Sequence, residues 1–208
     1  MIYLFSDKCY EGVEHLPLFE IHYIPLTTSL SPYDAVIFTS KNSVKAFILS
    51  EVSWSGLEVY AIGEATANAV RKEGGCVTFT CKDSYGDEFA HTIAPLLLGK
   101  RVFFPRAKEV VSSLFTILKE KKIDIYETVV YETVCKIYPR TSAPCKNAIL
   151  IFTSPSTVHC FMKNFTWDES YRAIAIGKKT AAALPLHVRC IISTQQSIEH
   201  CIELAKAI

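Results

Sequence analysis

Short runs of apolar residues recur along the chain, each followed by a more polar segment. The clearest runs read IYLFS, AVIFT, VYAIG, RVFFP, AILIFT and RAIAIG. They are rich in β-branched and aromatic residues and apolar at nearly every position, which is typical of strands buried on both faces. Apolar strands that alternate with helices form parallel sheets covered on both sides. The pattern therefore predicts an α/β fold.

The intervening segments have helical spacing. In residues 108–122 apolar side chains recur at Val110, Val111, Leu114, Phe115 and Leu118. Residues 197–208 form another amphipathic stretch. The run IDIYETVVYETVCKIYPR differs, because it is long, β-rich and unbroken by a helix. We interpret it as a candidate connection between two parts of the chain. Residues 26–34, rich in Ser, Thr and Pro, are the other linker-like stretch.

Two segments recur at a fixed offset of 114 residues. VIFTSKNSVKAFI (36–48) matches LIFTSPSTVHCFM (150–162), and VYAIGEATANAV (59–70) matches AIAIGKKTAAAL (173–184). Twelve of the 25 aligned positions are identical, where unrelated sequences of this composition would share about two. More loosely, IYLFSDK (2–8) resembles VFFPRAK (102–108). The 208 residues are therefore predicted to form two similar halves of about 100 residues, related by internal duplication.

Composition and charge exclude several classes of protein. Lys and Arg number 22 against 21 Asp and Glu, so the net charge is +1, and no block of like charges stands out. We therefore expect neither nucleic acid nor an anionic membrane as a partner. No apolar run approaches the roughly 18 residues of a membrane span, and the N-terminus lacks the pattern of a secretory signal. We expect a cytoplasmic protein.

The eight cysteines are scattered along the chain. Because no secretory signal precedes them and the chain is long enough to bury a core, we expect free thiols rather than disulfides. There is no CxxC pair, and Cys76 and Cys81 have no matching pair at the spacing of zinc ligands. The six histidines are equally scattered, so we expect no metal site.

The repeated motifs fall where predicted strands end and helices begin. The positions concerned are Thr39 and Ser40, Gly63 and Thr66, and their counterparts Thr153 and Ser154, Gly177 and Thr180. In open parallel sheets ligands bind at these carboxyl ends, where free N–H groups, hydroxyls and the helix dipole attract carboxylates or phosphates. The alternative is structural, since Ser and Thr are good N-caps and Gly permits tight turns. Two such sets facing one cleft would bind several anionic groups.

Arg106 is the best-placed cation, because it directly ends the apolar run RVFFPR. We take it as a candidate ligand of an anionic group. The sequence contains no GxGxxG, P-loop, GxSxG or HExxH motif, so nucleotide-dependent, hydrolase and metalloprotease chemistry lack their usual signatures. Catalysis without a cofactor remains.

The ordered set of motifs resembles uroporphyrinogen-III synthase over essentially the whole chain. The motifs are IFTSKNSVKAF, YAIGEATANAV, YGDEFA, GKRVFFPRA, VVYETV, IFTSPSTVHCF and IAIGKKTAAAL. The resemblance implies two α/β lobes joined by a two-stranded β connection that the chain crosses twice. Residues 1–25 and 136–208 would form one lobe, residues 31–132 the other, and residues 26–30 and 133–135 the connecting strands. The tandem repeat alone would place the boundary near residue 100.

Such a family membership implies a cofactor-independent cyclising lyase of haem biosynthesis. Its substrate, hydroxymethylbilane, is a linear tetrapyrrole with eight carboxylates, which loses water and closes to uroporphyrinogen III with inversion of ring D. The bilane also closes unaided to the uninverted isomer, so the enzyme's main task is to fix a folded conformation. We expect a monomer, and the resemblance leaves open a handover of substrate from hydroxymethylbilane synthase.

The resemblance also assigns site residues. Tyr131 in VVYETV corresponds to the family's candidate acid for departure of the hydroxyl group; a tyrosine also simply packs well in a strand. Gly63 and Gly177 match turns, and the hydroxyl positions of the family cleft match Thr39, Ser40, Thr66, Ser154, Ser156 and Thr180. Two features depart from the family: the helix expected after Lys8 is short, and Lys41 and Glu64 stand where small residues or proline are common.

Two other functions remain as alternatives. A two-lobed binding or sensor domain for an anionic ligand would show the same duplication and the same strand-end donors. A cysteine-based redox protein has only the eight thiols in its favour.

Overall fold

A computed structural model describes residues 1–81, 86–110 and 112–208 of the chain. The chain folds into two compact units. Unit 1 combines Met1–Glu20 with Val134–Ile208, and unit 2 is the continuous stretch Ile21–Thr133. Two strands pass from one unit to the other, β3 (Phe19–Tyr23) and β8 (Asp124–Cys135). The α/β prediction is confirmed.

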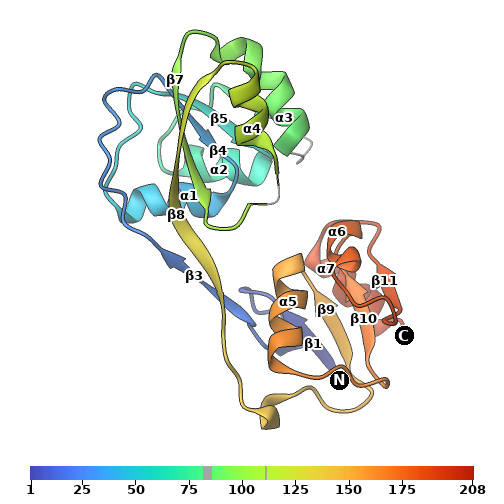
Figure 1. Ribbon diagram of the computed structural model, residues 1–208. Helices are drawn as coiled ribbons and strands as arrows, with labels where there is room; N and C mark the ends of the chain where they lie inside the picture. Colours follow the sequence, from blue (N-terminus) through green and yellow to red (C-terminus); the bar gives the residue numbers. More distant parts are fainter. Residues whose placement is uncertain (82–85, 111) are drawn as a thin grey trace. The chain divides into compact units, whose positions relative to one another are not determined.

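Unit 2 is built on a six-stranded sheet with the order β3-β8-β7-β4-β5-β6 (Figure 1). The strands from β8 to β6 pair in parallel. The remaining strands are β4 (Ala35–Phe38), β5 (Glu58–Ile62), β6 (Phe79–Cys81) and β7 (Arg101–Ala107). The helices are α1 (Lys41–Leu49), α2 (Glu64–Lys72), α3 (Gly86–Ile93), the short η1 (Ala94–Leu97) and α4 (Leu114–Glu120).

Alternating side chains of the central strand supply two separate cores in unit 2. Ile37 points to the face that α3 and α4 cover, where it packs near Phe89 and Leu114. Phe38, the next residue, points to the face of α1 and α2 and packs near Phe47. Both faces of the sheet are therefore buried, which explains why these strands are apolar at every position.

Unit 1 has a five-stranded, fully parallel sheet with the order β11-β10-β9-β1-β2. Its strands are β1 (Ile2–Phe5), β2 (Glu14–His15), β9 (Ile149–Phe152), β10 (Arg172–Ala175) and β11 (Cys190–Ile192). The helices are η2 (Arg140–Ser142), α5 (Pro155–Asn164), α6 (Lys178–Ala182) and α7 (Ile198–Lys206). Residues of α5 pack on one face of the sheet, and residues of α7 pack on the other.

The internal repeat is visible in the strand orders. Read from the edge, β6-β5-β4-β7-β8 of unit 2 corresponds to β11-β10-β9-β1-β2 of unit 1. The strong repeat covers β4 to α2 and β9 to α6, and the looser one relates β7 to β1. In unit 1 the last two strands of this order come from the start of the chain, so the repeat is circularly rearranged. This rearrangement makes unit 1 discontinuous in sequence.

Three local predictions were wrong. Residues 26–30, expected as a connecting strand, form no strand. The strand is β3 instead, where half-buried and exposed residues alternate, and residues 133–135 simply end β8. Pro25 interrupts the pattern after β3 because it lacks an N–H, and Leu26 and Leu30 pack into the core of unit 2 as loop residues.

The helix expected over residues 108–122 begins only at Leu114, because β7 continues to Ala107; Val111 lies outside the described residues. The prediction of a short helix after Lys8 is also wrong, because residues 9–13 form no helix. The turn there leads directly into β2, whose pairing with β1 extends the parallel sheet. Tyr85 of the YGDEFA motif lies outside the described residues.

The expectation of free thiols fails for one pair of cysteines. Cys135, the last residue of β8, is disulfide-bonded to Cys160 of α5. Their Cα atoms lie 5.2 Å apart, within the range that a disulfide spans, because both residues pack into the same core of unit 1. The two cysteines are 25 residues apart in the sequence, and this spacing gives no sign that they lie close together in the folded protein. The other six cysteines are free.

Candidate active site at the carboxyl ends of the strands

Ser40 ends the turn after β4 and is the N-cap of α1. Its backbone is extended, and its Oγ accepts a hydrogen bond of 3.1 Å from the Asn42 N–H. The first turn of α1 contains no acidic residue, so no carboxylate offsets the positive end of the helix dipole there. Thr39 lies half-buried directly before the cap. This turn offers amide and hydroxyl donors that suit an anionic group.

Gly63 makes the equivalent turn after β5. Its φ of 73° lies in the left-handed region, which glycine adopts without steric cost. Its N–H donates to the Cys81 carbonyl, and its own carbonyl accepts from the N–H groups of Thr66 and Ala67. Thr66 is only 5% exposed. The carboxylate of Glu64, at the start of α2, is held by Arg71 at 2.6 Å.

The turn after β9 in unit 1 resembles that after β4. Ser154 caps α5 in a reciprocal arrangement: its Oγ accepts from the Thr157 N–H at 3.3 Å, and Thr157 Oγ1 accepts from the Ser154 N–H at 3.2 Å. Pro155 follows at the first helical position, where a missing N–H costs nothing. Ser156 comes next and is half-buried.

The turn after β10 differs from its counterpart in unit 2. Gly177 has a φ of −174°, which is extended backbone that any residue adopts. A Cβ there would meet nothing closer than the Gln196 side chain at 3.7 Å. Thr180 is 3% exposed and occupies the same position in α6 as Thr66 in α2. Glycine is therefore required by the backbone at Gly63 and not at Gly177.

This difference gives a matched pair of variants. Gly63→Ala is expected to lower the free energy of unfolding by about 1–2 kcal/mol, because an L-residue is strained in the left-handed region. Gly177→Ala is expected to leave stability nearly unchanged, since its φ is extended and the space is open. Urea denaturation of both variants measures the difference. Equal destabilisation by the two substitutions would contradict this interpretation of the turns.

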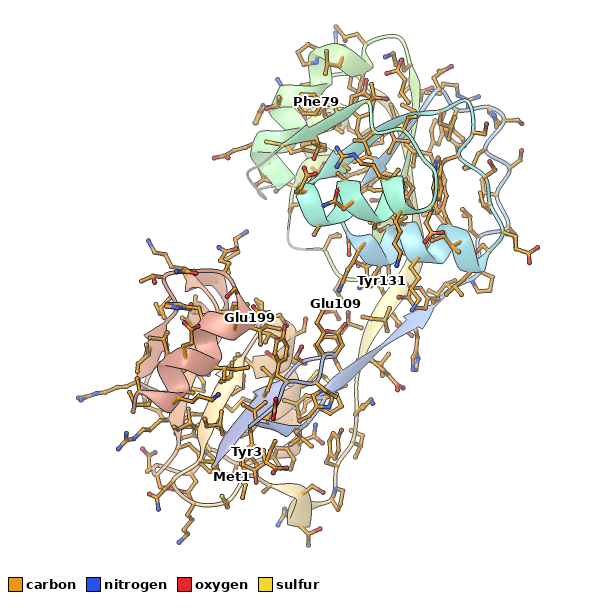
Figure 2. The ribbon with its side chains drawn as sticks, turned by 180° about the vertical axis from the view of Figure 1, so that it is seen from behind. Met1, Tyr3, Phe79, Glu109, Tyr131 and Glu199 are labelled. Carbon is orange, nitrogen blue, oxygen red and sulfur yellow. A yellow bond between two sulfur atoms is a disulfide. The ribbon has the colours of Figure 1, made fainter. Side chains whose placement is uncertain are left out.

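Tyr131 lies on β8 within unit 2 and is 8% exposed. Figure 2 shows it where β8 passes α1. Burial raises the pKa of its phenol, and a hydrogen bond with the Ser40 side chain lowers this pKa in part. Because this hydrogen bond lowers the pKa, the Ser40 hydroxyl is the donor and the Tyr131 oxygen the acceptor. Burial has the larger effect, so the pKa of the phenol lies above its ordinary value and the phenol is protonated at neutral pH.

The Arg106 guanidinium makes four hydrogen bonds within the protein. Its Nε and Nη2 donate to both carboxylate oxygens of Glu127 on β8, at 2.8 and 3.0 Å. Its Nη1 donates to the carbonyls of Ala107 and Lys108, at 2.9 and 3.1 Å. The sequence placed Arg106 at a strand end correctly, but it gave no sign of the acidic partner 21 residues later.

Unit 2 brings Thr39, Ser40, Gly63 and Thr66 to the ends of the neighbouring strands β4 and β5, and Tyr131, inside β8, contacts the Ser40 side chain. In unit 1, Ser154, Ser156, Gly177 and Thr180 follow the adjacent strands β9 and β10. Sequence analysis overlooked Ser43, whose Oγ is buried in the first turn of α1 without a hydrogen-bond partner. It also overlooked Thr157 of the α5 cap. The repeat pairs these two positions, and that pairing was the signal that could have found them.

Within the described part of the chain, no three His, Cys, Asp or Glu side chains gather as a metal site. No helix among the described residues is long and apolar enough to cross a membrane. What the strand ends offer is backbone N–H groups, hydroxyls and one buried phenol. Such a set can hold carboxylates and donate a single proton.

Together, fold and site define a duplicated α/β protein with amide and hydroxyl groups at its strand-to-helix turns and a buried tyrosine. The family model described as uroporphyrinogen-III synthase HemD matches residues 11–203. The crystal structure of uroporphyrinogen-III synthetase from Helicobacter pylori 26695 is similar, with 34% identity, a TM-score of 0.85 and coverage of 99% of this chain and 98% of that one. The chain belongs to the uroporphyrinogen-III synthase family.

More distant structures share the fold. A mutant uroporphyrinogen III synthase from the extremely thermophilic bacterium Thermus thermophilus aligns with 12% identity and a TM-score of 0.63, over 99% of this chain and 97% of that one. The wild-type enzyme of the same bacterium, in another crystal form, gives 13% identity and a TM-score of 0.52, over 99% and 96%. No curated protein sequence matches the chain.

Family membership makes the chain an enzyme of the uroporphyrinogen-III synthase type, a cyclising lyase of haem biosynthesis. The prediction from sequence is confirmed at this level. The alternative of a binding or sensor domain is not favoured, because both the family model and the similar solved structures are synthases.

Proposed function

We propose that the protein cyclises hydroxymethylbilane to uroporphyrinogen III, with loss of water and inversion of ring D. The observation that supports this most is the buried Tyr131 phenol beside the Ser40 cap, in a chain that matches the family from residue 11 to residue 203. The site pairs a proton donor with nearby carboxylate-binding donors. Those are the two functions that the reaction requires.

Tyr131 is the proton donor. As electrons from the pyrrole nitrogen expel the hydroxyl group of the substrate, the Tyr131 proton converts the leaving group to water. The remaining cation is attacked by the substituted α-carbon of ring D, which forms a spiro intermediate that fragments and recloses with ring D turned over. The last step releases the α-hydrogen of ring D as a proton, which returns to the Tyr131 phenolate. One water is lost overall, and the enzyme is restored.

The substrate carboxylates are held by amides and hydroxyls rather than by many cations. Each unit has such donors of its own: the cap Ser40 and the buried Thr66 hydroxyl in unit 2, and the cap Ser154 and the buried Thr180 hydroxyl in unit 1. Hydrogen bonds to an ionised carboxylate are stronger than neutral ones. Several of them can bind a substrate with eight carboxylates on a protein whose net charge is only +1.

Removing one of these hydroxyls should weaken binding without unfolding the protein. Thr66→Val keeps the shape of the side chain and is expected to raise KM about tenfold, as the loss of one hydrogen bond to a charged group predicts, with kcat little changed. Thr180→Val is the matching variant in unit 1. Steady-state kinetics measures both effects; a wild-type KM in both variants would show that these threonines are purely structural.

We further propose that the enzyme acts in the cytoplasm as a monomer and takes hydroxymethylbilane as it leaves hydroxymethylbilane synthase. Rapid capture is favoured because the free bilane closes unaided to the uninverted isomer. The small net charge fits a small-molecule substrate and gives no support to a nucleic-acid or membrane partner.

The test is to supply purified protein with freshly generated hydroxymethylbilane, oxidise the products and separate the type I and type III isomers by chromatography. Predominantly type III product is the expected result. Type I product alone, at the rate of a protein-free control, would overturn the proposed reaction.

A further inference from the structure

The strands β7 and β8 do not pair evenly. Arg106 pairs with Val129, but the next residue, Ala107, pairs with Tyr131. One residue of β8, Val130, is therefore extra at this point, which is a β-bulge. A bulge shifts the alternation of side chains and re-aims those that follow it.

The bulge decides which face of the sheet Tyr131 occupies. Before it, odd-numbered residues of β8 point toward α3 and α4, as Ile125 does in that core. Val130, an even-numbered residue, points to the opposite core beneath α1 and α2. Tyr131 is odd-numbered, yet it packs into the same core as Val130. Without the extra residue the period of two would turn Tyr131 away from α1 and its cap Ser40.

The Arg106 guanidinium holds both strands at this irregularity. It donates two parallel hydrogen bonds to Glu127 on β8, one to the carbonyl of Ala107 at the end of its own strand, and one to the carbonyl of Lys108 just beyond it. Next to these contacts, the Lys108 N–H donates to the Tyr131 carbonyl at 2.9 Å. The guanidinium thus fixes the backbone of Ala107 and Lys108. Both residues contact Tyr131 of β8, because Ala107 pairs with it and Lys108 donates to its carbonyl.

This ion pair differs from its neighbours on the same strands. Arg106 is 18% exposed, whereas the side chain of Lys108, which pairs with Glu132, is 65% exposed. Arg101 and Asp124, at the other end of the same strand pair, are joined by a single contact of 3.4 Å. Two-pronged and partly buried arginine pairs are the ones that fix geometry, and exposed single contacts do little.

We propose that Arg106 and Glu127 are positioning residues for Tyr131: together they hold the β-bulge that directs the phenol toward Ser40. In this role Arg106 is not a ligand of the substrate carboxylates. The predicted effect on kcat rests on the proposed function. The predicted effect on the position of Tyr131 does not depend on any substrate.

The experiment uses Arg106→Met, Glu127→Met and the double variant. Methionine removes the polar groups, nearly keeps the length of the glutamate side chain and replaces the aliphatic stem of the arginine. Arg101→Gln is the matched control, because it breaks an ion pair between the same strands far from the bulge. Positioning predicts a fall in kcat of about tenfold or more in both single variants. The double variant should be no worse than either, since the residues act as a unit. Arg101→Gln should retain wild-type kcat.

A direct role in binding predicts the opposite pattern. Arg106→Met would then raise KM, and Glu127→Met would leave turnover intact or improve binding by releasing the guanidinium. Wild-type kcat in Glu127→Met would overturn the proposal. Arg106→Lys keeps the positive charge but cannot make two parallel hydrogen bonds to Glu127. Under the positioning role its kcat should lie between those of Arg106→Met and the wild type.

A measurement without substrate separates this proposal from the proposed function. Tyrosines labelled with ¹³C at Cζ are titrated by NMR, and Tyr131 is assigned from its absence in Tyr131→Phe. In the wild type the pKa of Tyr131 should lie above its ordinary value, because the phenol is buried. Both single variants should bring it back toward about 10, as the ring leaves its site. If the Tyr131 pKa is the same in Arg106→Met and Glu127→Met as in the wild type, the positioning role is overturned, even if the protein cyclises the bilane. A fall of this pKa in both variants would support the positioning role, even if the protein does not cyclise the bilane.

Discussion

Replacing Tyr131 with phenylalanine is expected to lower kcat about a hundredfold or more, with KM nearly unchanged. General acid catalysis by a positioned side chain contributes about 10²–10⁴-fold, and phenylalanine removes only the donor. The ring itself stays buried in the core beneath α1, so substrate placement should be preserved. Stopped-flow or steady-state cyclisation assays measure the loss.

The matched control is Tyr126→Phe, on the same strand but 42% exposed. It removes an identical hydroxyl five residues away and should retain wild-type kcat. The pH profile gives a second check: because burial raises the pKa of Tyr131, the wild-type rate should hold through neutral pH and fall only as the phenol ionises above about 10. If Tyr131→Phe cyclised the bilane at the wild-type rate, Tyr131 would have no role as the acid.

Reducing the disulfide between Cys135 and Cys160 is expected to lower the free energy of unfolding by about 3 kcal/mol. The bond closes a loop of 25 residues, and the entropy that such a cross-link removes from the unfolded chain corresponds to a stabilisation of this size. Thermal unfolding with and without a phosphine reductant measures the effect on one and the same chain. The midpoint should fall on reduction.

The double variant Cys135→Ala, Cys160→Ala controls for other effects of the reductant and should show no shift between the two conditions. Cys9→Ala, at an exposed free thiol, should shift on reduction as the wild type does. An identical midpoint for oxidised and reduced wild type would mean that the bond does not stabilise unit 1. In the cytoplasm, the compartment proposed above, thiols are kept reduced, so the proposal predicts that the reduced form still cyclises the bilane.

Local patterns predicted most of the elements of this fold. Runs such as AVIFT and AILIFT are apolar at every position because both faces of their strands are covered, and this requirement is visible in a single segment. The duplication was equally visible, because Thr39, Gly63 and Thr66 recur at a fixed offset. These residues serve the local geometry of strand-to-helix turns, which short segments specify.

What the sequence could not predict depends on residues far apart in the chain. Arg106 was expected to be available for an anion, but Glu127 reaches it across a strand pair whose register includes a bulge. The placement of Tyr131 on the face of α1 depends on the same bulge, and strict alternation would have predicted the other face. The disulfide likewise joins segments that meet only when β8 and α5 pack together.

The most direct test of the central claim follows one bond of the substrate. Hydroxymethylbilane is labelled with ¹³C at the carbon that bridges rings C and D and at the ring-D α-carbon bonded to it. Inversion of ring D breaks this bond and attaches the bridge to the opposite α-carbon. The account predicts that the one-bond carbon–carbon coupling disappears from the NMR spectrum of the product formed by the protein. Product that retains this coupling would contradict it.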